Sequence, residues 1–451
     1  MERTHLLTSF QDFGLADPIS RALKEENYLT PTPIQAQTIP LALAGRDVVG
    51  IAQTGTGKTA AFAVPIMQRL VGNPARPAPR SVRALILTPT RELAAQIGDS
   101  FRTYGRYVGL RHALVFGGVG QKPQVDSLAR GVDILVATPG RLLDLLEQRH
   151  VKLDMVEVLV LDEADRMLDM GFIRDVKKII AMTSRKRQSL CFSATMPADV
   201  EHLVREILTD PVRIEVTPPS TTVERIEQRV YHVDGGNKRA LLSEVLKEKA
   251  LARVIVFTRT KHGANKVVEH LERSGVAADA IHGNKSQSAR QKALDNFRRG
   301  HARVLVATDI AARGIDVDGI THVVNFELPE VPEAYVHRIG RTARAGHDGM
   351  ALSFCGADER GLLRDIERKI GVTLTVVDTH PFHAAPGASN ANSRPPRHSN
   401  GNGQSRPWRG NGGGRSNGGG QGRGNAGGRG HSGGGQGRSN GGGNRASGGG
   451  R

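Results

Sequence analysis

Residues 48–59 read Val-Val-Gly-Ile-Ala-Gln-Thr-Gly-Thr-Gly-Lys-Thr, an apolar run followed by a glycine-rich turn. A helix-like stretch at residues 60–70 follows, so the segment predicts a strand, a phosphate-binding loop and a helix. In such a loop the glycines let backbone N–H groups face a β-phosphate, Lys58 reaches the β and γ oxygens, and Thr59 ligates Mg²⁺. Ala52 replaces the first glycine of the strict pattern. The nucleotide-binding residues expected here are Ala52, Gln53, Thr54, Gly55, Thr56, Gly57, Lys58 and Thr59.

A second apolar run, residues 158–161, ends in the acidic tetrapeptide Asp162-Glu163-Ala164-Asp165. A phosphate loop needs an acidic partner on another strand, and this tetrapeptide supplies it. Asp162 is expected to hold Mg²⁺ through water, while Glu163 orients or deprotonates the attacking water. The alternative is an acidic cluster at a helix N-terminus that only complements the helix dipole.

Short β-branched runs alternate with helix-like stretches up to residue 380, which predicts an α/β fold of parallel sheets covered by helices on both faces. Expected strands lie at residues 48–52, 84–87, 113–116, 133–137, 156–161 and 189–192, and then at 253–257, 278–281, 303–307, 321–326 and 351–354. Two short sequences recur at one offset of 170 residues: Leu135-Val136-Ala137-Thr138 as Leu305-Val306-Ala307-Thr308, and Thr88-Pro89-Thr90 as Thr258-Arg259-Thr260. The shared offset indicates a duplicated α/β unit.

The chain has 451 residues and a net charge of +17, which is unevenly distributed. Residues 381–451 hold 25 of the 54 glycines and 10 arginines but no lysine, aspartate or glutamate, which leaves +7 for residues 1–380. Such a segment cannot bury enough apolar surface to offset the entropy of ordering, so we expect a disordered basic tail. Its Arg-Gly pairs can bind phosphates and stack on bases; a plain solubilising extension is the alternative.

The sequence gives no sign of export or of membrane insertion. No run approaches the ~20 apolar residues of a membrane span, and residues 1–10 lack the apolar region of a secretory signal. The two cysteines, Cys191 and Cys355, lie far apart in apolar runs, so we expect buried thiols without a disulfide or a metal site. A cytoplasmic protein is expected. No heptad or exposed apolar stripe indicates an obligate oligomer, so we expect a monomer.

The order of further motifs resembles that of the DEAD-box RNA helicases of superfamily 2, most closely the bacterial RhlE-like group. The resemblance covers about residues 8–380. Besides the phosphate loop and the acidic tetrapeptide, the matching motifs are Pro31-Thr32-Pro33-Ile34-Gln35, Pro89-Thr90-Arg91-Glu92-Leu93, Gly117-Gly118, Thr138-Pro139-Gly140-Arg141, Ser193-Ala194-Thr195, Gln287 with Arg290, Arg313-Gly314-Ile315-Asp316, and His337-Arg338-Ile339-Gly340-Arg341-Thr342-Ala343-Arg344.

The resemblance implies two RecA-like domains that close on ATP and single-stranded RNA. The expected division is an ATP-binding domain at residues 1–215 with an adenine-recognition segment at 8–36, a linker at 216–222, a second helicase domain at 223–380 and the tail at 381–451. Asn27 stands where the family usually has glycine; because asparagine tolerates positive φ, the turn is expected to survive.

The resemblance also assigns roles around the nucleotide. The Gln35 amide can pair with adenine and Phe10 can stack on it, which makes the site adenine-specific. Arg341 and Arg344 correspond to arginine fingers that reach the γ-phosphate, a contribution of about 10³–10⁵ in rate. The remaining implied roles are ribose binding by Asp316, and coupling of the nucleotide to RNA by Ser193, Thr195 and His337.

Implied RNA contacts consist mostly of glycines, hydroxyls and arginines at strand ends, a chemistry that binds the backbone without reading bases. They are Thr90, Arg91, Gly117, Gly118, Thr138, Arg141, Arg259, Gln287, Arg290, Thr308 and Asp309. Threonines in such positions also cap helices, which is compatible with RNA binding. The expected function is an ATP- and Mg²⁺-dependent RNA helicase that separates short duplexes, or remodels RNA–protein complexes such as ribosomal or decay particles, by bending one strand.

Two alternatives remain open. A DNA-directed translocase of the same superfamily would carry a DExH-type acidic motif and no adenine-reading glutamine, so Asp165 and Gln35 argue against it. A non-catalytic RNA-annealing or scaffold protein would act mainly through the Arg/Gly tail, and the complete set of hydrolytic motifs argues against that as the sole function.

Overall fold

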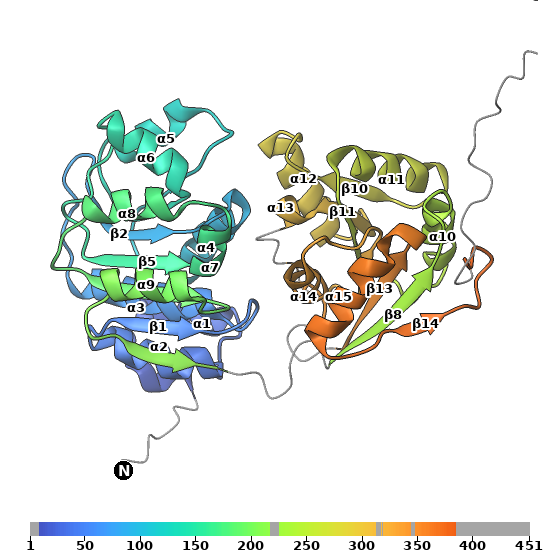
Figure 1. Ribbon diagram of the computed structural model, residues 1–451. Coiled ribbons are helices and arrows are strands. Elements are labelled where there is room, and N and C mark those ends of the chain that lie inside the picture. The colour runs from blue at the N-terminus through green and yellow to red at the C-terminus, as the bar shows by residue number, and fades with distance from the viewer. Residues whose placement is uncertain (1–8, 217–224, 313–316, 318, 344–347, 385–451) are drawn as a thin grey trace, which may run out of the picture. The chain divides into compact units, whose positions relative to one another are not determined.

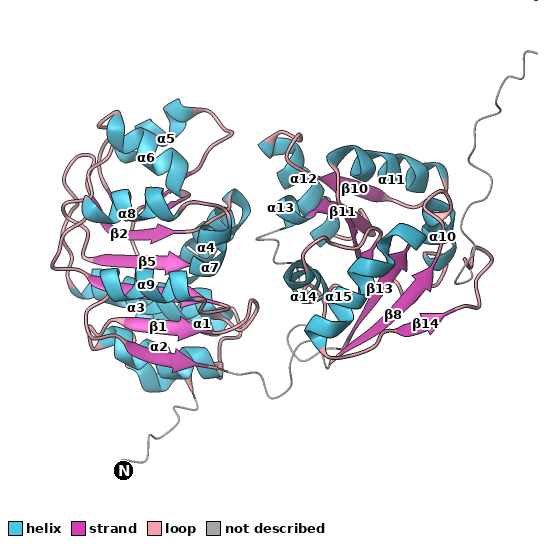
Figure 2. Ribbon diagram, in the orientation of Figure 1, coloured by secondary structure: helices cyan, strands magenta, loops and turns pink. Residues whose placement is uncertain are grey.

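The computed structural model describes residues 9–216, 225–312, 317, 319–343 and 348–384. These residues form two seven-stranded sheets, each flanked by helices (Figures 1 and 2). Every strand pairing within the two sheets is parallel. The predicted fold class, two tandem RecA-like α/β domains, is confirmed. We call the sheet of β1–β7 with its helices the first domain and that of β8–β14 the second domain.

The first sheet has the strand order β3-β4-β2-β5-β6-β1-β7. Its strands are β1 Val48–Ile51, β2 Val82–Leu87, β3 His112–Val115, β4 Val132–Ala137, β5 Val158–Asp162, β6 Gln188–Ser193 and β7 Val212–Glu215. The helices are η1 Phe10–Phe13, α1 Asp17–Glu25, α2 Pro33–Leu43, α3 Lys58–Gly72, α4 Arg91–Tyr104, α5 Gln121–Leu128, α6 Pro139–Glu147, α7 Ala164–Asp169, α8 Ile173–Ala181 and α9 Ala198–Ile207.

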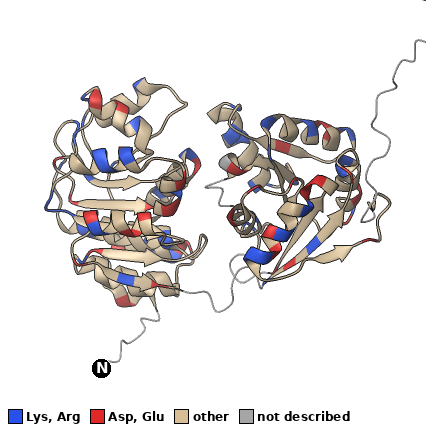
Figure 3. Ribbon diagram, viewed as in Figure 1, with Lys and Arg blue, Asp and Glu red and all other residues tan. Residues whose placement is uncertain are grey.

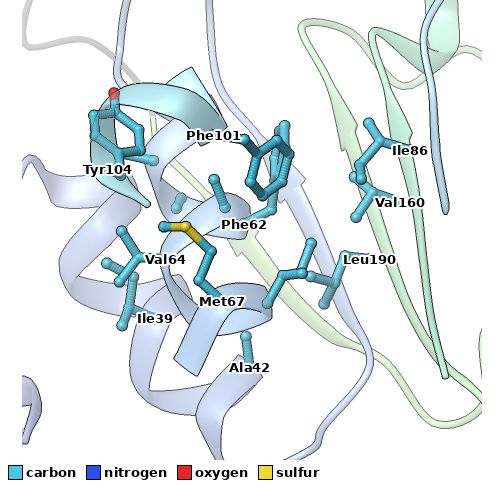
Figure 4. Close-up of a cluster of buried hydrophobic side chains, with 14 of the residues drawn as sticks. Ile39, Ala42, Phe62, Val64, Met67, Ile86, Phe101, Tyr104, Val160 and Leu190 are labelled. Atoms are coloured by element: carbon cyan, nitrogen blue, oxygen red, sulfur yellow. The ribbon is translucent and has the colours of Figure 1, made fainter. Parts of the chain in front are cut away.

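Alternate residues of these strands enter two separate cores, one on each face of the sheet. Ala84 and Ile86 of β2 join the core formed with α1 to α4, whereas Leu85 and Leu87 join the core formed with α6 to α9. Figure 4 shows the first of these cores, where Met67 lies among side chains from several helices and strands. Burying a large apolar side chain contributes about 1.5–3 kcal/mol, so both faces hold the sheet in place.

The second sheet has the order β10-β11-β9-β12-β13-β8-β14. Its strands are β8 Ile226–His232, β9 Val254–Thr258, β10 Ala278–Ile281, β11 Val304–Thr308, β12 His322–Asn325, β13 Gly349–Cys355 and β14 Thr375–Val377. The helices are α10 Lys238–Val245, α11 Lys261–Arg273, α12 Gln287–Arg298, α13 Asp309–Ala312, α14 Pro332–Ile339, η2 Ala357–Glu359 and α15 Arg360–Ile370. One core packs α10 and α11 on the sheet, and two others hold α12 and the pair α14–α15.

The two sheets share their strand order position by position, and the sequence echo lies in matching strands. Leu87 of β2 pairs with Ala137 of β4, and Phe257 of β9 pairs with Ala307 of β11. Both members of the second pair lie 170 residues after those of the first. The echo therefore marks the same register in two copies of one α/β unit, as the duplication hypothesis predicts.

All the strands expected from apolar runs are present, and the structure adds β7, β8 and β14. β7 and β14 are edge strands at the same end of their sheets, and β8 lies next to β14. Each of the three strands includes exposed residues, and β14 has no buried one, so none forms a continuous apolar run. The expected start of the tail at residue 381 is wrong for its first four residues. His383 bridges to Val233, and Phe382 packs against the second-domain core.

Several predictions fall outside the described residues. They are the linker residues 217–222, the segment Arg313 to Asp316, Arg344, and the tail from residue 385, whose disorder stays a prediction.

The placement of charged residues and the burial of the two cysteines agree with the predicted α/β fold. Most charged residues lie on helices and loops, although β7 and β8 carry two each (Figure 3). Cys191 and Cys355 are both buried and free, as predicted. Burial raises the pKa of the Cys191 thiol to about 12 and that of Cys355 to about 11. Among the described helices, none has the length and apolarity to cross a bilayer.

Candidate functional site

The phosphate loop connects β1 to α3 at the carboxyl end of the first sheet. Gly55 and Gly57 have φ of 80° and 92°, values that favour glycine, and Gly57 is the residue before the helix. The Lys58 ammonium is buried beneath the loop and donates to the Ala52 carbonyl at 2.6 Å. The Thr56 hydroxyl donates to the Gln53 carbonyl at 2.8 Å. The loop is thus closed on itself around the lysine at the N-terminus of a 15-residue helix, a position that favours anions.

Gln35 joins the predicted adenine segment to this loop. Its amide accepts from the Thr32 backbone N–H at 2.9 Å and donates to the Gly57 carbonyl at 3.1 Å, and the side chain is 2% exposed. A Cβ at Gly57 would lie 2.3 Å from the Gln35 nitrogen. The structure therefore places Gln35 directly on the phosphate loop; its pairing with adenine stays a prediction.

Phe10 has a packing role in this structure. Its ring contacts Phe13 and Tyr28 edge-on, with centroids 5.4 and 5.5 Å away, and it is 5% exposed. Little of the ring is left for an adenine base, so the stacking role stays a prediction. The neighbouring Asn27 has φ of 59°, which confirms that asparagine carries the positive-φ turn.

Asp162 is the last residue of β5, and its carboxyl group interacts electrostatically with the Lys58 ammonium. The carboxyl is buried, and its Oδ1 has no hydrogen-bond partner among the described residues. Burial, with the neighbouring charge of Glu163, raises the pKa of Asp162 to about 7, against the opposing effect of Lys58. A buried carboxylate with an unused oxygen is costly unless a cation or a donor joins it.

These residues fit Mg²⁺ of the kind that accompanies nucleotide phosphates. Mg²⁺ in such sites keeps several waters and takes one or two protein oxygens, so a dense cluster of protein ligands is not needed. In keeping with this, the described residues contain no group of three or more His, Cys, Asp or Glu side chains that could hold a metal. The unused oxygen of Asp162 and the hydroxyl of Thr59, at the start of α3, are the candidate ligands.

Glu163 is held in a strained backbone conformation beside Arg166. Its φ of 55° is in the left-handed region, which is uncommon for a residue with a side chain. Its carboxylate forms an ion pair with Arg166, and the two side chains are 9% and 10% exposed. Sequence reasoning did not assign Arg166 a role, although its place three residues later on a helix was a usable signal.

Asp165 is a hydrogen-bond centre that sequence reasoning also left unassigned. Its Oδ2 accepts from the Thr195 N–H and hydroxyl, both at 2.9 Å, and from the Ala194 N–H at 3.2 Å. The Asp165 N–H donates to the Ser193 hydroxyl at 3.1 Å, and the Ser193 carbonyl accepts from the Ala52 N–H at 3.0 Å. Ser193 therefore connects the acidic tetrapeptide to the phosphate loop, and Thr195 contacts the tetrapeptide; the coupling role of the two residues stays a prediction.

The RNA candidates of the first domain lie at the ends of three other adjacent strands, β2, β4 and β3. Thr90 and Thr138 precede α4 and α6, and the Thr90 hydroxyl accepts from the Leu93 N–H at 3.3 Å. Gly117 and Gly118 follow β3. The structure thus brings these motifs to one edge, and Thr90 caps its helix as well.

Arg91 lies against the glycine pair after β3, where Gly118 has φ of 79°. A Cβ at Gly118 would lie 1.9 Å from the Arg91 guanidinium, and one at Gly117 would lie 3.4 Å from it. Arg141 lies nearby, with its guanidinium 3.5 Å from the Val119 carbonyl. Burial lowers the pKa of Arg91, and the positive charge of Arg141 makes a smaller contribution in the same direction. Two guanidinium groups over a glycine turn form a suitable surface for a phosphate backbone.

In the second domain, Asp309 is committed to an internal ion pair. Its two carboxylate oxygens accept from Arg338 at 2.6 and 2.8 Å, and Arg338 is 1% exposed. Arg338 therefore points inward. Helix α14 ends at Ile339, so Arg341 follows the helix, with its Nε donating to the His337 carbonyl at 3.2 Å.

The other RNA candidates of this domain also lie at strand ends or helix starts. Thr308 ends β11, Arg259 follows β9, and Gln287 and Arg290 lie in the first turn of α12. These residues lie at the ends of β11 and β9 or on the helix that follows β10. These strands are the counterparts of β4, β2 and β3 in the first domain.

Comparisons with known proteins agree with this arrangement. The DEAD/DEAH box helicase family matches residues 32–203, and the helicase conserved C-terminal domain matches residues 237–346. The ATP-dependent RNA helicase RhlB of Pseudomonas syringae is 46% identical over 85% of this chain and 98% of its own length. The RNA helicase CrhR of Synechocystis is 45% identical over 83% of this chain and 75% of its own length.

Solved structures with the same architecture include two that hold RNA. Saccharomyces cerevisiae Dbp5 bound to RNA and ADP BeF3 is 30% identical, with a TM-score of 0.73 over 82% of this chain and 95% of that one. Mss116p bound to single-stranded RNA and AMP-PNP is 28% identical, with a TM-score of 0.74 over 83% and 80%.

Proposed function

The chain belongs to the DEAD/DEAH box helicase family, and from this premise we propose that it is an RNA-stimulated ATPase that separates short RNA duplexes or remodels RNA–protein complexes. The relatives RhlB and CrhR carry the name RNA helicase. The grouping with RhlE-like members stays a prediction.

One observation carries the proposal: the strand order of the first sheet divides its candidate residues into two neighbouring sets. Strands β5, β6 and β1 present the phosphate loop, the acidic tetrapeptide and the Ser193 bridge. Strands β3, β4 and β2 present the threonines, the glycine pair and Arg91. Because parallel strands end at one edge, an ATP set and an RNA set lie side by side on a single rigid sheet.

In the ATP set, each residue has a proposed task. Lys58 and the loop N–H groups bind the phosphates, and Asp162 with Thr59 holds Mg²⁺, which neutralises charge on the phosphate oxygens when bound. Glu163 orients the attacking water and is itself oriented by Arg166. Through its hydrogen bonds to Ser193 and Thr195, Asp165 transmits a movement of the acidic tetrapeptide to these two residues.

In the RNA set, the contacts are proposed to follow the backbone of one strand. The glycines, hydroxyls and guanidinium groups at this edge suit phosphates and sugars, so no base sequence is read. Preference for RNA would come from 2′-hydroxyl contacts. Bending of the bound strand would then release its partner.

The second domain is proposed to supply Arg341, Arg344 and His337 to the ATP and coupling functions, and Asp316 to the ribose. Domain limits of 1–215 and 223–384, with a linker between and a basic tail after, complete the proposal. The fitting partners are RNA and RNA–protein particles such as ribosomal or decay complexes, bound by a cytoplasmic monomer.

The experiment that tests the function is ATP hydrolysis by the purified chain with and without single-stranded RNA. We expect slow turnover that rises on addition of RNA. RNA-independent turnover at the stimulated rate would contradict the proposal. A DNA strand of the same sequence serves as the control for the translocase alternative.

Truncation after Ala384 separates the helicase from the scaffold alternative. The cut is placed there because Phe382 and His383 pack on the second domain. We expect preserved RNA-stimulated hydrolysis with weaker and less salt-sensitive RNA binding, since the tail carries arginines that release counterions. Complete loss of RNA-dependent activity would favour the scaffold function.

A further inference from the structure

Glu359 is a buried carboxylate in the second domain, at the end of η2. The side chain is 3% exposed. Its Oε1 accepts from the Arg259 guanidinium at 3.0 Å and from the Leu328 N–H at 3.2 Å. Its Oε2 accepts from the Gly356 N–H at 3.0 Å and from the Lys238 ammonium. Four donors from four separate segments therefore fix this carboxylate in one orientation.

Lys238 balances the charge of Glu359 inside the domain. It is the first residue of α10, is 4% exposed, and also donates to the Phe326 and Phe354 carbonyls at 3.0 and 3.1 Å. An ammonium has three N–H donors, so all three are used. Because a buried carboxylate is tolerated only when paired and hydrogen-bonded, Lys238 is what allows Glu359 to be there.

Arg259 differs from its two partners because it reaches the surface. Its side chain is 34% exposed, while its backbone N–H donates to Glu327 at 2.6 Å. It follows β9, beside the end of β11 where Thr308 and Asp309 lie. One side of the guanidinium is thus tied to the domain, and part of the group remains accessible to solvent.

We propose that Glu359 is a positioning residue for RNA binding, which holds the guanidinium of Arg259 at the strand edge where the RNA backbone binds. The inference rests on the proposed RNA-binding function. A loose arginine must lose rotamer freedom when it binds a phosphate, whereas a tethered one has lost it in advance. Lys238, Arg259 and Glu359 together carry one net positive charge, and the Glu327 carboxylate that accepts from the Arg259 backbone N–H balances it. The tether therefore acts by fixing the guanidinium in place rather than by adding charge.

The test is a double-mutant cycle in the full chain, with Glu359→Asp and Arg259→Ala, measured as the affinity for a fluorescent single-stranded RNA in the presence of AMP-PNP. Glu359→Asp keeps the negative charge beside Lys238 but shortens the reach toward Arg259. We expect RNA binding to weaken about twofold to tenfold, the range for ordering one long side chain. The double variant should bind no more weakly than Arg259→Ala alone.

Glu359→Gln provides a second variant and Glu367→Gln a matched control. Gln cannot accept from both sets of donors, so Glu359→Gln should weaken RNA binding as well. Glu367 is a carboxylate of the same domain that accepts from the Leu374 N–H at 3.0 Å. Within the part of the chain that the structure describes it forms no hydrogen bond or ion pair with Arg259, so its replacement should leave RNA affinity unchanged. Thermal unfolding of each variant separates loss of stability from loss of positioning.

Three outcomes would overturn the inference: unchanged RNA affinity in Glu359→Asp, unchanged affinity in Arg259→Ala, or losses that multiply in the double variant. If the unsubstituted chain bound no RNA, both this inference and the proposed function would fail. RNA-stimulated hydrolysis in the unsubstituted chain, together with any of the three outcomes, would remove only the positioning role.

Discussion

The turn after β1 and the turn after β8 occupy equivalent places in two sheets of matching strand order. Each leads to a helix that begins with a buried lysine, Lys58 in the first domain and Lys238 in the second. Lys58 donates to the Ala52 carbonyl and forms no ion pair with any residue that the structure describes. Lys238 is paired with Glu359.

The difference shows how one fold can keep or lose a phosphate site. The charge of Lys58 is available to an incoming anion, whereas that of Lys238 is neutralised within the domain. The turns differ as well: Gly57 has positive φ in a loop closed around its lysine, and Gly235 and Gly236 have open space around them. A single buried carboxylate, far away in the sequence, therefore gives Lys238 a structural contact at the position where the first domain has the lysine that we propose to bind phosphate.

The largest expected effects come from substituting each of the two lysines in a separate variant. Lys58→Ala should lower the rate of ATP hydrolysis by about 10²–10³, the usual cost of removing one charge-stabilising donor. Lys238→Met should retain nucleotide affinity but reduce the free energy of unfolding by about 3–5 kcal/mol, because the buried Glu359 loses its ammonium partner and stays paired with the partly exposed Arg259. Steady-state kinetics and chemical denaturation measure the two effects. Equal loss of nucleotide affinity in both variants would contradict the comparison.

The glycines of the two turns give the next largest effect. Gly57→Ala forces a side chain into positive φ and toward the Gln35 amide, at a cost of about 1–2 kcal/mol, so ATP affinity should fall about tenfold. Gly235→Ala has no atom within 4 Å of the new Cβ and should change neither ATP affinity nor stability by more than about 0.5 kcal/mol. Nucleotide titration of both variants checks this, and similar losses would show that the two turns do not differ as described.

A smaller effect is expected at the RNA edge of the first domain. Gly118→Ala pushes the new Cβ against the Arg91 guanidinium, so RNA affinity should fall about threefold to tenfold while ATP affinity stays the same. Gly120→Ala is the control, because its nearest atom lies at an ordinary 3.7 Å. Anisotropy with labelled RNA measures the difference. A fall in ATP affinity alone would contradict the division of the sheet into two sets.

The sequence was sufficient for the features that repeat locally. Apolar runs of β-branched residues predicted the central strands, and glycines next to a lysine predicted the phosphate loop. The strands β7, β8 and β14 lack a continuous apolar run because each includes exposed positions, and β14 has no buried residue at all.

Contacts between distant segments could not be predicted. Lys238 and Glu359 lie 121 residues apart, and neither belongs to a recognised motif. Asp165 was visible in the tetrapeptide, but its bonds to Thr195 depend on β5 and β6 being neighbours. The resemblance assigned Phe10 to adenine stacking, which stays a prediction, but it gave no indication of the edge contacts with Phe13 and Tyr28 that bury the ring.

The smallest effect concerns residues 378–384, the segment that follows β14 in the second domain. His380 lies against Tyr231, His383 and Asp378, and both of its ring nitrogens are buried without a partner among the described residues. Burial, followed by His383, lowers the pKa of His380 below its usual 6.5, despite the opposing charge of Asp378.

Because the packed state binds the proton less readily than the released state, packing of residues 378–384 should weaken as pH falls below about 6.5. Exchange of the Ala384 amide, which donates to the His232 carbonyl at 3.0 Å, should accelerate by less than about tenfold relative to its intrinsic rate. The Val254 amide, which donates to the Arg303 carbonyl at 3.0 Å in the same sheet, is the control. A constant ratio of the two protection factors between pH 7.5 and 5.5 would contradict this.

Glu163 is the residue that we propose to orient the attacking water. Glu163→Gln should retain ATP and RNA binding and lose turnover, because the amide cannot deprotonate water. Single-turnover hydrolysis with bound RNA measures this directly, and unchanged turnover would remove Glu163 from its role.

The most direct test of the account is the number of nucleotides bound per chain, measured by calorimetric titration of AMP-PNP with Mg²⁺ into the full chain and its two lysine variants. The account predicts one nucleotide per chain, lost in Lys58→Ala and retained in folded Lys238→Met. A second nucleotide that disappears in Lys238→Met, or one nucleotide that persists with unchanged affinity in Lys58→Ala, would contradict it.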